Sequence, residues 1–397
     1  MSLLEVITKA SANPEPPGSH IDHPIILNPN DIFLNLKPKH ENISRASLVN
    51  PVSGWEISQT DTQLIDSGKK FYAKLKRKLK DTNNFNKDEF IGILNPFLVK
   101  LSEHVGISNV SDMSNNGFTW ILIEKIGFLM GRDVAGLVLE ACLGLKIWEL
   151  VEALIINGLV DHSCYSNLVM KLAKEKRSDL LCLCVRYAPD LGSSELLCIL
   201  KYFLCPPKDA YGSMVSVRKE WESQALLAIE KATDEKLSRK KLCVAKEASI
   251  WLMVAHDGFS VSELCLHYLL GSSNVDEVIL SSSISKLSGK EMMNLIRYLG
   301  KWLKKFERFP QARPCPEASY MLGLSACDWV PKLEVVVKCL GLVLDENFSS
   351  LILHPEFQDE LRSIEVVVSS LVLETRFCCP IANVLKNLVV DDETVQN

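Results

Sequence analysis

The sequence predicts an all-α protein: a helical-repeat (α-solenoid-like) array preceded by a disordered, Pro-rich N-terminal arm. Between residues 85 and 390, apolar side chains recur at the three- and four-residue spacing of helices, in segments separated by Gly, Asn, Ser, Asp and Pro. Two runs, LEVVVKCLGLVLDENF from Leu333 and IEVVVSSLVLETRF from Ile364, share EVVV and a terminal Phe at an offset of 31 residues. Such an offset is typical of one helical hairpin with its turns, the unit that stacks into α-solenoids.

The first predicted segment is the arm, residues 1–58. Asn and Ser surround two short apolar islands in it, HPIIL and DIFLNL. A segment of this composition buries too little apolar surface to offset the entropy of ordering it, so we expect an extended or disordered arm whose islands are available to dock elsewhere. Its prolines are Pro14, Pro16, Pro17, Pro24, Pro29, Pro38 and Pro51.

The second segment is a basic amphipathic helix, residues 59–84. The tetrapeptide TDTQ has the pattern of a capping box and is expected to begin the helix. Phe71, Leu75 and Leu79 follow at intervals of four residues and therefore share one face. The remaining faces carry seven cations: Lys69, Lys70, Lys74, Lys76, Arg77, Lys78 and Lys80.

Three interpretations of these seven cations stay open: a solvated helix face, a nuclear import or nucleolar retention signal, or a contact for the RNA backbone. The formal net charge of −5 and a pI near 6.0 exclude a uniformly basic protein, so nucleic-acid contact must come from a local patch. A second basic face, Arg297 to Arg313, is interrupted by Glu307 and flanked by prolines. We expect that face to be solvated only.

The array itself, residues 85–390, is followed by an acidic tail, 391–397, that we expect to be disordered. Capping boxes SVSE and SGKE lead into two of its helices, and the three-four spacing in the EVVV runs favours helix over strand. The predicted helices are Lys87–Val105, Gly117–Met130, Asp133–Leu145, Ile147–Asn157, Ser163–Lys174, Asp179–Tyr187, Ser193–Leu204, Val217–Ala232, Lys241–Ala255, Ser262–Leu270, Val275–Ser282, Lys290–Phe309, Ala318–Cys327, Leu333–Asp345, Pro355–Phe377 and Ile381–Val389.

The thirteen cysteines lie in apolar runs at irregular spacing. Reduced thiols in a core are the expected state, which indicates cytosol or nucleus. The N-terminal residues lack the basic and apolar regions of a signal peptide, and no stretch is long and apolar enough to predict a membrane span.

Few clusters suggest catalysis or metal binding. Asp161, His162, Ser163 and Cys164 are consecutive, so their side chains diverge, and a helix cap is the better interpretation. Cys182 and Cys184 are separated by about 200° on a helix and cannot share one ion. No phosphate loop or hydrolase motif is present. The sequence therefore predicts no catalytic residue, cofactor, metal or small-molecule substrate.

Four histidines are expected to be surface or capping residues and not metal ligands: His20, His23, His256 and His267. The other pair of neighbouring cysteines considered as metal ligands is Cys378 and Cys379.

The run GLVDHSCYSNLVMKLAKEKRSDLLCLCVRYAPDLGSSELLCILKYFL, Gly158 to Leu204, resembles the C-terminal helical region of the nucleolar protein 11 family. The shared features are a Leu-rich helix before a Ser-Cys turn, a Leu-Leu-x-x-Cys helix, a Pro-Asp step and a helix that ends in Phe-Leu. These features correspond to Ser163, Cys164, Leu180, Leu181, Cys184, Pro189, Asp190, Phe203 and Leu204.

This resemblance implies a non-enzymatic scaffold of the small-subunit processome, which supports pre-rRNA transcription and processing in the nucleolus. Its implied partners are other processome proteins, with indirect or weak contact to pre-rRNA and none with a membrane. The family places a β-propeller before the helical region, whereas here the preceding segment shows no strand-turn repeats. The alternative is a cytosolic α-helical adaptor unrelated to RNA.

Overall fold

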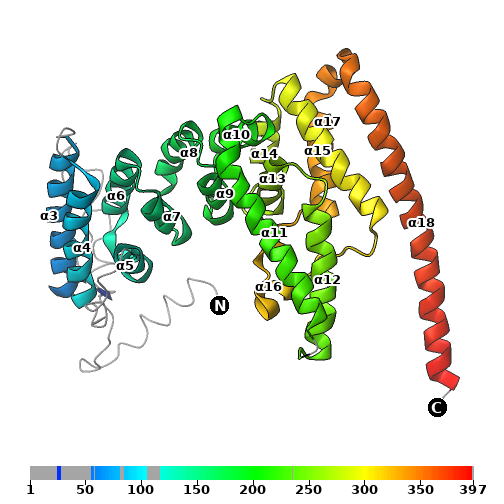
Figure 1. Cartoon of the computed structure of the whole chain (residues 1–397), viewed down its shortest axis with the longest axis horizontal. Coiled ribbons are helices and arrows are strands. Elements are labelled where there is room, and N and C mark those ends of the chain that lie inside the picture. Colours follow the sequence, from blue (N-terminus) through cyan, green and yellow to red (C-terminus); the bar gives the residue numbers. More distant parts are fainter. Residues whose placement is uncertain are drawn as a thin grey trace, which may run out of the picture. The chain divides into compact units, whose positions relative to one another are not determined.

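The described chain is almost entirely helical, which confirms the predicted all-α class (Figure 1). The predicted arm, residues 1–58, lies outside the described residues apart from two short strands, β1 (Ile25–Leu27) and β2 (Trp55–Ile57), which pair antiparallel. None of the described helices has both the length and the apolar character needed to cross a bilayer. This computed structural model describes the backbone of residues 25–27, 55–57, 59–80, 85–104, 117–234 and 236–395 and the side chains of 62–80, 85–104, 117–234 and 236–376.

The chain divides into two compact units, residues 1–141 and 142–397. In the first, α4 packs against both α3 and α5. Phe71 of α3 stacks on Phe97 of α4 with their ring centroids 4.1 Å apart, and Leu75 is fully buried. The helices of this unit are α3 (Gln59–Lys80), α4 (Lys87–His104), α5 (Phe118–Ile126) and the short 3-10 helix η1 (Gly127–Met130), followed by α6 (Arg132–Leu145), which continues into the second unit.

Many helices of the second unit contact near neighbours in the sequence, as in a helical-repeat array, and α9 and α10 also pack on α13 and α14, four helices later. For example, α8 packs on α9 and α10, α11 packs on α12 and α13, and α15 packs on α17 and α18 (Figure 1). The helices are α7 (Trp148–Ile156), η2 (His162–Cys164), α8 (Tyr165–Lys174), α9 (Ser178–Tyr187), α10 (Ser193–Leu204), η3 (Lys208–Ala210), α11 (Tyr211–Thr233), α12 (Arg239–His256), α13 (Val261–Gly271), α14 (Glu277–Ile284), α15 (Gly289–Arg308), α16 (Glu317–Leu322), η4 (Ser325–Trp329), α17 (Leu333–Leu353), η5 (Pro355–Phe357) and α18 (Gln358–Val395).

The start signals predicted for α13 and α15 are confirmed. In α13, the Ser260 backbone N–H donates to Glu263 Oε2 at 2.7 Å, and the Ser260 hydroxyl accepts from the Glu263 backbone N–H. The same capping box, between Ser288 and Glu291, begins α15. Each box satisfies backbone donors that would otherwise have no partner in the first turn.

Several predicted boundaries are wrong. Helix α3 begins at Gln59, the first residue of the predicted segment, so TDTQ lies inside the helix and does not start it, and the helix ends at Lys80. Helix α11 begins at Tyr211, six residues earlier than predicted. Helix α18 runs without a break to Val395, through Pro380 and into the segment expected to be a disordered tail. Proline removes only one backbone hydrogen bond, so it weakens or bends a helix without necessarily ending it; Pro96 likewise lies inside α4.

Candidate interaction surfaces

Helix α3 has an apolar side and a cationic side, as predicted. Phe71 and Leu75 are buried, and Leu79 is half-buried. The cationic face consists of the six exposed cations Lys69, Lys70, Lys74, Lys76, Arg77 and Lys80.

Lys78 differs from the other six cations. Its Nζ lies 2.6 Å from Glu89 Oε1 of α4, and the residue is half-buried. This ion pair ties α3 to α4 within the first unit. Lys78 therefore contributes less to the outward charge than its position in the sequence suggests, and it is excluded from the cationic face.

In the second basic face, Arg297 to Arg313, three of the six cations form ion pairs with carboxylates outside α15. Lys301 Nζ lies 2.8 Å from Glu263 of α13. Arg297 Nε lies 3.5 Å from Glu360 of α18, and Lys305 contacts Asp257 after α12. These pairs lower the net charge that α15 presents, so this face is a weaker candidate for nucleic acid than α3.

The Asp161 to Cys164 cluster forms a helix cap, as expected. Asp161 Oδ1 accepts hydrogen bonds from the Ser163 backbone N–H at 3.1 Å and from the Ser163 hydroxyl at 2.8 Å. His162 Nδ1 lies 3.2 Å from the Asp190 carbonyl. The carboxylate is therefore directed at the backbone of η2, and it does not orient the imidazole as a catalytic triad would.

The cysteine side chains that the structure describes are free thiols. Cys182 and Cys184 are both buried in α9; Cys182 lies beside Cys265 of α13, and burial raises the pKa of Cys184 to about 12. Thiols in this state are protonated at neutral pH and act as apolar core groups. In the part of the chain whose side chains are described, no group of three or more His, Cys, Asp or Glu could hold a metal ion. His20, His23, Cys378 and Cys379 lie outside it.

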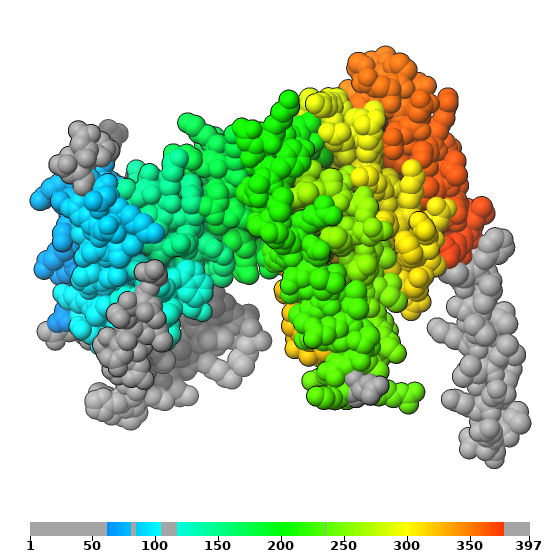
Figure 2. Space-filling model, in the orientation of Figure 1, coloured from blue at the N-terminus to red at the C-terminus, as the bar shows by residue number. Residues whose placement is uncertain are grey.

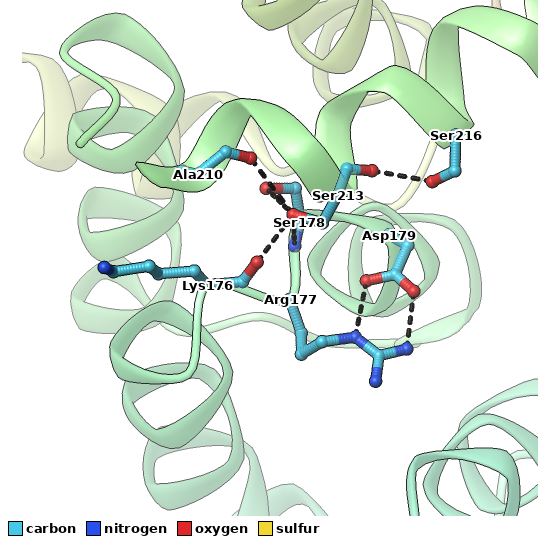
Figure 3. A network of polar contacts seen from close by, with 7 residues as sticks. All are labelled: Lys176, Arg177, Ser178, Asp179, Ala210, Ser213 and Ser216. Atoms are coloured by element: carbon cyan, nitrogen blue, oxygen red, sulfur yellow. Dashed lines mark hydrogen bonds and ion pairs between the residues drawn. The ribbon is translucent and has the colours of Figure 1, made fainter. Parts of the chain in front are cut away.

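A buried polar network holds the segment that carries the family resemblance (Figure 3). Ser213 of α11 donates its hydroxyl hydrogen to the Lys176 carbonyl at 2.6 Å and accepts from the Ser178 backbone N–H at 3.2 Å. Lys176 has a positive φ of 57°, which is uncommon for a residue with a side chain. Ser178, fully buried, contacts the Tyr202 hydroxyl of α10 at 3.0 Å. One serine thus fixes the turn between α8 and α9 to the start of α11.

We expect Ser213→Ala to lower the free energy of unfolding by about 1–3 kcal/mol, because it leaves the buried Ser178 N–H without its acceptor. Urea denaturation measures the change. Ser216→Ala is the matched control: its hydroxyl donates to the Ser213 carbonyl at 2.6 Å, three residues away on an exposed helix face. Equal effects of the two substitutions would contradict the assigned role.

The prediction for His267 is wrong. This residue is fully buried in the middle of α13, where Trp221, Phe259 and Trp302 place their rings within 5.4 Å of the imidazole centroid. Its Nε2 lies 2.9 Å from the Ala255 carbonyl. The sequence signal was LCLHYLL, a histidine inside a run that is apolar on every helix face and therefore buried on every face.

Two partners fix the tautomer of His267. The Ala255 carbonyl only accepts, so Nε2 carries the hydrogen, and Nδ1 accepts from the Tyr298 hydroxyl at 2.8 Å. Burial lowers the pKa of His267 to about 3, an effect that the Ala255 hydrogen bond opposes and His256 reinforces. The imidazole is therefore a neutral structural connector between α12, α13 and α15.

An apolar groove of about 780 Å³ lies between α17 and α18. Val337, Leu344, Phe348 and Ile352 of α17 line it and are exposed, Phe348 by 64% of its surface. On the side of α18 the groove is lined by Leu361, Ile364 and Val368. Phe348 lies directly after Asn347, where α17 is kinked with a φ of −122°.

The EVVV repeat explains how the groove forms. Its equivalent residues Val336 and Val367 are both buried, on α17 and α18, the two helices that pack on α15. The next residues, Val337 and Val368, both line the groove. The two related helices thus bury the same position in the core and present the next position to the same opening. The sequence showed the repeat but not this arrangement.

Comparison with protein-family models, with curated proteins and with solved structures found no match to this chain.

Proposed function

We propose that this protein is a non-enzymatic scaffold of nucleolar ribosome biogenesis, acting in the small-subunit processome, and that α3 is its nuclear and nucleolar address. The cationic face of α3 carries the proposal. Six exposed cations lie on one helix whose apolar side is anchored on α4, so the positive charge is held on a folded surface. Import receptors read short runs rich in Lys and Arg, and RNA backbones bind similar surfaces.

Two further observations support a role in binding proteins. Helical-repeat arrays commonly present extended surfaces to partners, and the second unit packs in this way. The segment from Gly158 to Leu204, which resembles the nucleolar protein 11 family, folds into α8, α9 and α10 at nearly the predicted boundaries. The proposed partners are other processome proteins, with indirect or weak contact to pre-rRNA, and the proposal needs no cofactor or metal.

Localisation of the tagged full chain tests the address. We expect nucleolar accumulation of the wild type and its loss when the six residues of the cationic face are replaced by alanine. Lys78→Ala is the matched control. Because Lys78 is paired with Glu89 and is not part of the cationic face, this substitution should leave localisation unchanged. A second control replaces the five lysines of the face by arginine, which keeps the charge.

A cytosolic wild-type protein would contradict the address, as would an alanine variant that still accumulates in nucleoli. Co-purification then separates the two functions: processome proteins and pre-rRNA favour the scaffold, whereas trafficking or signalling proteins favour the cytosolic adaptor. If the cationic face binds RNA directly, affinity should fall steeply with salt, with a slope of about −0.7 per neutralised phosphate on single strands. A flat salt response would leave only contact through proteins.

A further inference from the structure

We infer that the groove between α17 and α18 binds a cationic amphipathic helix of a partner protein. The inference does not depend on the nucleolar address, because it uses a different surface. It rests on three properties of the groove: the spacing of its apolar residues, their exposure on α17, and the charge of the two helices that form it.

The apolar residues of α17 have the spacing that a docked helix requires. Val337, Leu344, Phe348 and Ile352 follow at intervals of seven, four and four residues and therefore form one stripe. From Val337 to Ile352 the stripe is about 22 Å long at 1.5 Å per residue, enough for about four turns of a partner helix. Partner helices that bind in grooves present apolar anchors at matching i, i+3, i+4 and i+7 positions.

The groove also leaves apolar side chains uncovered. Its exposed apolar residues, including Phe348, lie on α17, whereas Leu361 and Val368 of α18 are half-buried. Burying such side chains against a partner helix is favourable, because it removes apolar surface from water. Glycine at position 341 widens the opening, since a Cβ built there meets nothing within 4 Å.

Charge decides between the occupants. Residues 333–376 contain eight carboxylates and three cations. Glu365 and Arg362 both line the groove from α18, and exposed Asp345 follows the groove residue Leu344 on α17. The excess of negative charge therefore comes from the two helices around the groove as well as from its lining. A second copy that docked through this same groove would bring an equally acidic surface, and like charges at an interface disfavour binding. A helix with an apolar stripe matches the apolar residues that line the groove, and lysines or arginines on its flanks match the carboxylates of α17 and α18.

The probe for this inference is a fluorescent synthetic helix of about 18 residues, or five turns, with leucines on one stripe and lysines elsewhere. Its binding to the full chain is measured by fluorescence anisotropy. Gly341→Met should fill the groove without changing the charge and weaken binding by about tenfold or more, equivalent to about 1.4 kcal/mol. Gly144→Met is the matched control: this helical glycine in α6 also has open space around its Cβ position, and binding should be unchanged.

A second pair of measurements tests the charge and protects against misfolding. The double variant Asp345→Lys with Glu365→Lys should bind the lysine probe more weakly and an otherwise identical glutamate probe more strongly. Phe348→Glu, at a largely exposed position, replaces Gly341→Met if that variant does not fold. The inference is overturned if both groove variants bind as the wild type does, if the glutamate probe binds wild type equally well, or if sedimentation shows a dimer that the probe does not disrupt.

Discussion

Gly271→Ala is expected to lower the free energy of unfolding by about 3 kcal/mol, at the upper end of the cost of forcing extra atoms into a packed core. Gly271 is the last residue of α13, and a Cβ at this position would lie 2.7 Å from the backbone carbon of Trp329 and 2.8 Å from its Cα. Backbone atoms cannot move aside as a flexible side chain can. The added methyl must therefore separate α13 from η4.

Separating α13 from η4 should displace the aromatic rings that lie beside Gly271. The Arg186 guanidinium lies 5.2 Å from the Tyr268 ring centroid and 5.3 Å from that of Trp329, so movement of η4 disturbs this stack. Urea denaturation followed by tryptophan fluorescence measures the stability loss. Gly144→Ala is the control, and it should be neutral or stabilising by up to about 1 kcal/mol, because alanine favours helix and the site is open. A Gly271→Ala protein as stable as wild type would contradict the close approach.

The second large effect is a loss of stability in acid that depends on His267. The pKa of His267 is about 3 in the folded protein, against 6.5 for an unperturbed histidine. Below pH 6.5 the unfolded chain takes up the proton and the folded chain does not, so the stabilisation is complete above pH 6.5 and is lost as pH falls toward 3. The cost is about 1.4 kcal/mol for each pH unit in this window.

His267→Gln isolates this contribution. At pH 8 the variant should be less stable than wild type by about 1–3 kcal/mol, because hydrogen bonds to the Tyr298 hydroxyl and the Ala255 carbonyl are weakened or lost. Between pH 6.5 and pH 4, however, its stability should fall less steeply than that of wild type. His354→Gln, at an exposed histidine, should keep the wild-type slope. Parallel pH profiles for wild type and His267→Gln would show that other groups cause the acid sensitivity.

Local features of the sequence predicted most of the fold. Helix α15 was predicted within one residue at each end, because one stripe of large apolar side chains and a capping box mark it. The end of a helix was harder to predict than the presence of the helix. Helix α17 continues past its expected end at Asp345, through the kink at Asn347 to Leu353, so Phe348 and Ile352 were not assigned to a helix. Both residues line the groove.

Pairings between distant residues could not be predicted. Phe71 and Leu75 were predicted to share one helix face, and both are buried. Nothing in the run of cations, however, distinguishes Lys78, whose partner Glu89 lies on the next helix. His267 was misplaced because a histidine near the end of a predicted helix was expected to cap that helix or to face water, whereas every face of α13 around it is covered. Which surfaces face each other depends on packing between helices that are distant in the sequence, and local patterns of residues do not reveal that packing.

The EVVV repeat has a consequence for how an assembly could grow from this chain. Two successive helices, α17 and α18, use the same residue pattern to pack on α15 and to open toward the groove. A partner helix bound there would pack as one more helix of the array, donated by another polypeptide. Binding would then be completion of a fold across two chains, and the specificity of the complex would follow the same packing rules as the interior of the protein.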